Sequence, residues 1–306
     1  MKGLQVYFLG FAIGVNMLMA GHLSAQHTEL VPSDSASMPE ENFTHELRFA
    51  QYLTDKDAFE EAIFVLSNLN SLTLTVPQRD SLRYSLGWNA YSAKQLGLAS
   101  RSLLTVSSQS PYYLKSQFFG NYSRAFQGQT DSAYAALNQL TVPDATLNEL
   151  KAVELAGISL LKRDYDAFNQ HRQGFTYASY ALSTEEKRMD DYAHKLQSFK
   201  RKSPVLAGLY SAVVPGLGKI YAGKKRQGIA SLLPILSMGL LTYEGLRKDG
   251  VKSARFISFG TLFTVFYVGN IWGSVLSVKI KRNEFNREYD NKILFDMHIP
   301  MRNLFQ

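Results

Sequence analysis

Apolar positions along the chain form three patterns: a run at the start, short stripes through the middle, and long uncharged runs near the end. Between residues 42 and 200, short stripes of helical period alternate with small or polar breaks. The long runs further on have the composition of membrane helices. These patterns predict an all-α protein in which a helical region precedes a small helical membrane module.

The middle region repeats itself. Leu86, Phe119 and Leu155 occupy equivalent positions 33 and 36 residues apart, and a polar break follows each of them. This spacing is close to the period of about 34 residues in tetratricopeptide repeats. Region 42–200 therefore resembles degenerate tetratricopeptide repeats, with other helical-hairpin solenoids as the alternative. Such arrays usually present a concave face to a protein partner.

Small residues punctuate each repeat. Gly87, Gly120 and either Ala156 or Gly157 lie in the middle of predicted helices, beside large apolar side chains. A helix pair cannot bury its apolar stripe alone, so neighbouring pairs must stack. We expect these small residues to let paired helices approach closely. The aromatic residues of the same helices either fill the core or line a binding groove.

The first 25 residues form a leader. A short basic start precedes an apolar stretch, and the polar exit His22-Leu23-Ser24-Ala25 suits a signal peptidase, with Ala25 as the last leader residue. Residues 1–25 are thus predicted to be a cleaved signal peptide, with an uncleaved anchor as the alternative. Residues 26–41, rich in serine, proline and acidic residues, predict a flexible lead-in.

Three uncharged segments make up a predicted membrane module at 203–280. They cover 203–218, 227–243 and 256–278, and about 20 apolar residues span a bilayer. The third is therefore a transmembrane helix and the second is nearly long enough, whereas the first is too short to decide. In the third, Gly269 and Gly273 form a Gly-x-x-x-Gly step that favours close helix packing in lipid.

A glycine-rich motif separates the first two segments. Its defining residues are Pro215, Gly216, Gly218, Tyr221 and Gly223, and Gly228 follows five residues later. Pro-Gly ends a helix, the glycines allow tight turns, and the tyrosine suits a membrane interface. Three cations come next and are expected to contact lipid phosphates. They are Lys224, Lys225 and Arg226.

This motif is similar to the Pro-Gly-x-Gly-x-x-Tyr-x-Gly signature of small bacterial modules with two transmembrane helices. It looks closest to a variant that follows tetratricopeptide-like regions in exported proteins of Gram-negative bacteria, a domain of unknown function. The family usually has glutamine where this chain has Lys219. The resemblance implies a membrane protein and brings no known reaction with it.

Charge divides the chain into two parts. Residues 1–194 carry 15 Lys/Arg and 20 Asp/Glu, whereas residues 195–306 carry 18 and 6. A basic segment suits anionic lipid or nucleic acid, and its long apolar runs favour lipid, so we expect no nucleic-acid partner. Charges alternate in the tail at 281–306, which predicts a solvated helix that leaves the membrane.

Catalytic patterns are missing from the sequence. It has no cysteine, no phosphate-binding loop, no hydrolase elbow, and no histidines with metal-ligand spacing. Acidic pairs such as Glu185–Glu186 are adjacent, point to different helix faces, and are expected to be solvated. We therefore expect no catalytic site, no cofactor and no metal.

Together these features predict a non-enzymatic, membrane-anchored protein of the cell envelope. Its repeats would lie in the periplasm as a scaffold for a protein partner, and its module would hold it in the inner membrane. The alternative is a lipid-interacting or transport-related membrane component that the repeats regulate.

Overall fold

The computed structural model of the protein describes residues 38–305, and every regular element in that range is helical. This confirms the prediction of an all-α protein. The expected signal peptide and most of the expected lead-in lie outside the described residues. Helix α1 (Met38–Asp55) already begins within the segment expected to be the lead-in, since a proline in the first turn is compatible with a helix.

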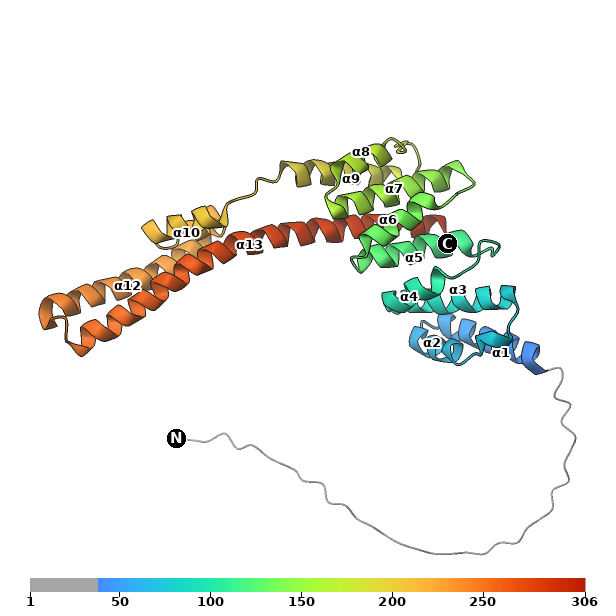
Figure 1. Ribbon diagram of the computed structural model, residues 1–306, viewed down its shortest axis with the longest axis horizontal. Helices are drawn as coiled ribbons and strands as arrows, with labels where there is room; N and C mark the ends of the chain where they lie inside the picture. Colours follow the sequence, from blue (N-terminus) through green and yellow to red (C-terminus); the bar gives the residue numbers. More distant parts are fainter. Residues whose placement is uncertain (1–37, 306) are drawn as a thin grey trace, which may run out of the picture.

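Four helix pairs follow one another and stack side by side (Figure 1). They are α1 with α2 (Phe59–Ser67), α3 (Val76–Ser92) with α4 (Leu96–Leu103), α5 (Tyr113–Phe126) with α6 (Thr130–Gln139), and α7 (Ala145–Lys162) with α8 (Tyr165–Arg172). One turn of 3-10 helix, η1 (Ser71–Thr73), precedes α3, and α9 (Ser183–Ser198) lies at the end of the stack.

Each pair reverses direction at a residue with a left-handed backbone. These residues are Asp57 (φ 58°), Lys94 (φ 64°), Gly128 (φ 80°) and Arg163 (φ 61°), at intervals of 37, 34 and 35 residues. Only one of the four is glycine, although this conformation is uncommon for other residues. The four helix pairs thus share one backbone feature at similar intervals along the chain.

Two of the expected glycine contacts hold the stack together. A Cβ atom built on Gly87 would lie 2.6 Å from Cγ of Leu103, and one built on Gly120 would lie 2.7 Å from Cγ of Leu104. Real side chains do not approach so closely, so glycine is required for this spacing. The prediction that these glycines allow close packing is confirmed.

The last helix, α13 (Ala254–Leu304), contains 51 residues and joins the two halves of the molecule (Figure 1). Its C-terminal part packs against α5, α7 and α9. Tyr289, Ile293, Met297 and Met301 recur every four residues and are buried in the same core as the repeats. The third repeat glycine, Gly157, faces this helix, because a Cβ there would lie 2.6 Å from Sδ of Met297.

Polar contacts fix the position of α13 along the stack. The Asp296 carboxylate is 1% exposed and accepts hydrogen bonds from Nη1 of Arg188 at 3.1 Å and Oη of Tyr192 at 2.7 Å. The Tyr122 hydroxyl donates to the Leu294 carbonyl at 3.1 Å. A buried carboxylate is costly without such partners, so these contacts select one register of the helix.

The tail at 281–306 therefore differs from the expected solvated segment. No break separates it from the membrane module, because α13 continues through residue 280. Charged residues such as Lys281 and Glu288 are exposed, as expected, but the apolar residues between them face the stack. Alternating charge describes only one side of a helix and gives no sign of what packs on the other side.

The membrane-like part contains α10 (Pro204–Val213), α11 (Leu217–Tyr221), α12 (Lys225–Asp249) and the first half of α13. Two of its helices, α12 and α13, are long and apolar enough to cross a membrane. In contrast, ten residues of α10 rise only about 15 Å, half the thickness of the hydrocarbon layer. The uncertain first segment is thus a short helix that packs against α13.

Helices α12 and α13 form a hairpin that projects away from the stack (Figure 1). Only 11% of the most apolar window of α12 and 22% of that of α13 is buried. The core helix of a soluble protein would bury most of such a window. The connection at 250–253 is the far tip of the hairpin, and the opposite ends of both helices lie towards the stack.

Replacing Met297 with alanine should destabilise the protein, because this side chain is fully buried between α13 and the repeats. Large-to-small changes at such sites cost about 2–5 kcal/mol of unfolding free energy. The matched control is Phe295→Ala, on the same helix but 60% exposed, which should cost less than about 0.5 kcal/mol. Denaturant unfolding of the full chain in neutral detergent measures both, and equal effects would contradict the docking of α13.

Candidate functional site

The glycine-rich motif lies at the base of the membrane hairpin, between α10 and α12. Gly216 is the residue before α11 and has a left-handed backbone with φ 86°. The five-residue helix α11 carries Gly218 and ends at Tyr221, and Gly223 (φ 92°) then leads the chain into α12. All of the motif residues therefore serve one tight connection.

Glycine is required in this connection because backbones meet there. A Cβ built on Gly216 would overlap the Gly228 carbonyl, and one built on Gly218 would overlap the Ala207 carbonyl. A Cβ on Gly228 would lie 2.5 Å from Cγ1 of Ile220. The motif thus brings α10, α11 and α12 into direct backbone contact, as small residues do in lipid.

Serine hydroxyls link this connection to α13. The Gly218 N–H donates to Oγ of Ser211 at 3.0 Å, and that hydroxyl lies 2.6 Å from Oγ of Ser274. All three residues are buried. Because backbone donors away from water need a partner, this chain of hydrogen bonds satisfies the first turn of α11 and couples it to α13.

Tyr221 holds the linker that leads from the repeats. Its hydroxyl accepts the backbone N–H of Ser203 at 3.2 Å, and its carbonyl accepts Nζ of Lys202 at 2.5 Å. The same Lys202 amino group lies 5.2 Å from the centre of the Tyr221 ring, and Tyr210 packs edge-on against that ring. The tyrosine expected at the membrane interface therefore also fixes the direction of the chain.

The three cations expected to contact phosphate have different surroundings. Nζ of Lys224 lies 3.3 Å from Oε1 of Glu284, and its side chain is 16% exposed. It therefore ties the start of α12 to α13. Lys225 and Arg226 begin α12 and are exposed.

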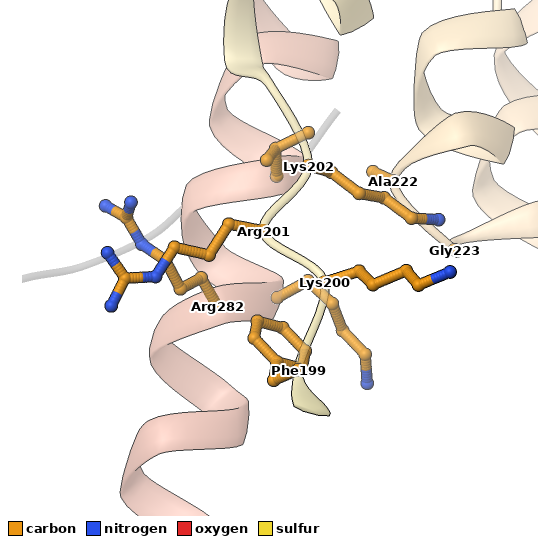
Figure 2. A pocket seen from close by; sticks show the side chains of 9 residues that line it. Phe199, Lys200, Arg201, Lys202, Ala222, Gly223 and Arg282 are labelled. Atoms are coloured by element: carbon orange, nitrogen blue, oxygen red, sulfur yellow. The ribbon is translucent and has the colours of Figure 1, made fainter. Parts of the chain in front are cut away.

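Other cations gather instead around a cavity of about 190 Å³ between the linker, the α11–α12 turn and α13 (Figure 2). Its apolar lining includes Phe199, Ala222 and Val278. Five cationic side chains line it. They are Lys200, Arg201 and Lys202 from the linker and Lys281 and Arg282 from α13.

The sequence contains a pattern that could have predicted this cluster, although it is not part of any single motif. Two basic groups, at 200–202 and 279–282, flank the membrane module about 80 residues apart. Helices that leave and return on one side of a bilayer bring such flanking groups together. Without the path of α13, the second group was indistinguishable from other charges of the tail.

Among residues 38–305, the Gly-x-x-x-Gly step does not bring two helices into close contact. Within residues 38–305, nothing lies within 4 Å of a Cβ built on Gly269, and Gly273 meets only the end of the Lys219 side chain at 3.4 Å. Close packing comes from the motif glycines instead. Gly-x-x-x-Gly spacing identifies a helix face made of small residues, but it does not show which helix packs on that face.

A buried polar side chain lies on the same helix. Asn270 is 4% exposed, and neither its amide oxygen nor its nitrogen has a hydrogen-bond partner among the described residues. An unsatisfied amide is expensive in a membrane. A polar side chain inside a membrane helix usually bonds to a neighbouring helix, and the described residues supply no such partner for Asn270.

One acidic pair expected to be solvated is buried instead. Both Glu185 and Glu186 are buried, and the loop before α9 contacts the second of them. Glu186 accepts the backbone N–H groups of Thr176 at 3.2 Å and Tyr177 at 2.7 Å. Burial, together with neighbouring Glu149, raises the pKa of Glu186 to about 7. The carboxylate therefore has a structural role in holding this loop.

Within the range 38–305, no group of three or more His, Cys, Asp or Glu side chains is placed to hold a metal ion. No protein-family model, curated protein or solved structure matches the chain. The resemblance of the motif to two-helix bacterial modules therefore stays a prediction from the residues themselves.

Replacing Gly218 with alanine should loosen the base of the hairpin, because the new methyl group would overlap the Ala207 carbonyl. Such overpacking typically costs about 1–3 kcal/mol. Gly269→Ala is the control, since its Cβ meets open space. Thermal unfolding in detergent should show a lower midpoint for Gly218→Ala and little change for Gly269→Ala. Similar midpoints for the two variants would contradict the packing role of the motif.

Proposed function

We propose that the protein is a non-enzymatic, membrane-anchored scaffold whose helical repeats bind a protein partner. One observation carries this proposal: a single helix, α13, is both an apolar hairpin arm and part of the core of the repeats. A domain joined to its anchor in this way has a fixed orientation relative to the bilayer.

The rigidity of that link supports a scaffold. At 1.5 Å per residue, the 51 residues of α13 extend about 75 Å. A second connection, the linker at 199–203, is held to α13 by Phe199, which stacks on Phe285 with ring centres 3.9 Å apart. Two connections resist bending better than one flexible tether. A partner bound to the repeats would therefore be held at a defined distance from the membrane surface.

The surface available to a partner differs from the concave groove expected from the repeat pattern, because α13 itself packs on α5, α7 and α9. The first helix pair is the more open surface. It exposes three large aromatic side chains, and exposed aromatic groups are characteristic of interaction sites. They are Phe49 (45% exposed), Tyr52 (56%) and Phe64 (69%).

For location, we propose the inner membrane with the repeats in the periplasm. The leader pattern supports export, and a two-helix hairpin returns α13 to the side on which the repeats lie. The distribution of basic residues opposes this orientation, since cations concentrate at the stack end of the hairpin and the positive-inside rule favours the cytoplasm for them. The leader pattern and the positive-inside rule thus predict opposite orientations, and a topology measurement decides between them.

The alternative function is a lipid-interacting or transport-related component regulated by the repeats. The unsatisfied amide of Asn270 and the nearby Lys219 favour it, because intramembrane polar groups often mark ion or substrate paths. Replacement of Asn270 by leucine separates the two functions. If the protein has a transport role, the variant should insert normally into the membrane but lose the transport activity in cells. If the hairpin is only an anchor, the variant should insert and function normally.

Single introduced cysteines should report two membrane crossings, because the natural chain has no cysteine. In Ser198→Cys and Asn303→Cys the thiols lie on the side of the repeats, and in Val251→Cys the thiol lies at the far tip. A membrane-impermeant maleimide added to intact spheroplasts should label the first two and spare the third. Labelling of only one of the first two would contradict the hairpin, and labelling of Val251→Cys alone would place the repeats in the cytoplasm.

A photo-crosslinking amino acid at Tyr52 or Phe64 should trap a discrete partner in living cells. Tyr180 is the control, since it is fully exposed but lies in the loop between α8 and α9, outside the first helix pair. The full chain is needed, because a fragment ending at residue 200 would lack the part of α13 that completes its core. A crosslinked species of equal yield from Tyr180, or none from either test position, would contradict the proposed surface.

A further inference from the structure

We infer that the cavity at the base of the hairpin binds the phosphate-bearing head group of an anionic phospholipid. This inference rests on the proposed membrane insertion and goes beyond it by naming a site and a ligand class. The cavity is formed by three segments far apart in the sequence: the linker, the α11–α12 turn and the middle of α13 (Figure 2).

The cations around the cavity are largely unneutralised. Among the described residues, no carboxylate lies within ion-pair distance of Lys200, Arg201 or Arg282. Lys281 has only a distant contact, 3.9 Å from Glu284. Lys202 donates to a carbonyl rather than to an anion. Figure 2 shows Arg201 and Arg282 on one side of the linker and Lys200 and Lys202 on the other. Like charges on each side repel one another, and a bound anion would reduce that repulsion.

The guanidinium groups suit a phosphate in particular. Arg201 and Arg282 line the same cavity and project to the same side of the linker (Figure 2). Arginine binds phosphate oxygens through paired N–H groups, and its charge persists at any physiological pH. The cavity of about 190 Å³ is more than ten times the 10–15 Å³ that one water requires, which leaves room for a phosphodiester.

The apolar lining of the cavity favours a lipid over a free phosphate ion. Ala222 and Val278 form a small apolar cluster with Ala207 and Tyr221, and Phe199 adds an aromatic wall. A free phosphate ion gains nothing from apolar walls, whereas the glycerol and upper acyl carbons of a lipid do.

The position along the hairpin agrees with a head group. The uncharged run of α13 ends at Val278, and charged residues begin at Lys279. Helix α12 begins nearby, at Lys225. The cavity thus lies where apolar helix surface gives way to charge, which is the depth of lipid phosphates in a bilayer.

The test uses the full chain in a neutral detergent, where no anionic surface attracts cations in general. Calorimetric titration with short-chain phosphatidylglycerol should show saturable binding at one site. Each cation near such a lipid contributes about fivefold in affinity, so the double variant Arg201→Gln, Arg282→Gln should bind about 25-fold more weakly.

The matched control is Lys279→Gln with Arg287→Gln. These two exposed cations lie on α13 near the same end of the hairpin but outside the cavity, so their loss should change affinity less than about threefold. Equal loss in the two double variants, or binding that does not saturate, would overturn the site.

Two further titrants identify the source of the phosphate. Inorganic phosphate should bind much more weakly than phosphatidylglycerol, and equal affinity would overturn the lipid assignment in favour of a free anion. Short-chain phosphatidylcholine should also bind more weakly, because its positive head group faces the same cations. Extraction of membranes at alkaline pH tests insertion separately: release of the chain would contradict the anchor, whereas retention without lipid binding would overturn only this inference.

Discussion

The burial of one face of α13 against the repeats is the interaction on which the rest of the structure depends. Ile293 and Met297 fill space that the helix pairs leave open. Met297 can approach α7 closely because residue 157 is a glycine and has no side chain there. Each buried side chain of this size contributes about 1.5–3 kcal/mol. The repeats and the hairpin are therefore one body, and the linker follows a path set at both of its ends.

The base of the hairpin depends on a different interaction. Apolar burial gives no driving force between helices in lipid, where we propose that the hairpin lies. Here the chain relies on close backbone contact at Gly216 and Gly218 and on hydrogen bonds through Ser211. The same contacts leave the linker cations next to those of α13. Tight glycine packing and the basic cavity thus have a common origin in one short turn.

Much of this architecture was predictable from the sequence. Helical period and the recurrence of Leu86 and Phe119 indicated stacked pairs, and Gly87 correctly marked a close approach. The docking of α13 was not predictable, because periodicity shows that Met297 is on an apolar face without showing what covers it. For the same reason Glu186 was expected in water and Gly269 against a helix. Local patterns determine the face of an element, whereas its partner depends on long-range geometry.

The position of α13 after the repeats in the sequence gives the protein an order of assembly. Domains usually begin to fold as they leave the ribosome, but the repeats lack part of their core until residues 289–301 have been made. Under the proposed membrane insertion, this part of α13 would dock on α5 and α7 once the hairpin before it lies in the bilayer. A chain with a misplaced hairpin would then keep apolar surfaces of α5 and α7 uncovered, and proteases and chaperones recognise such surfaces.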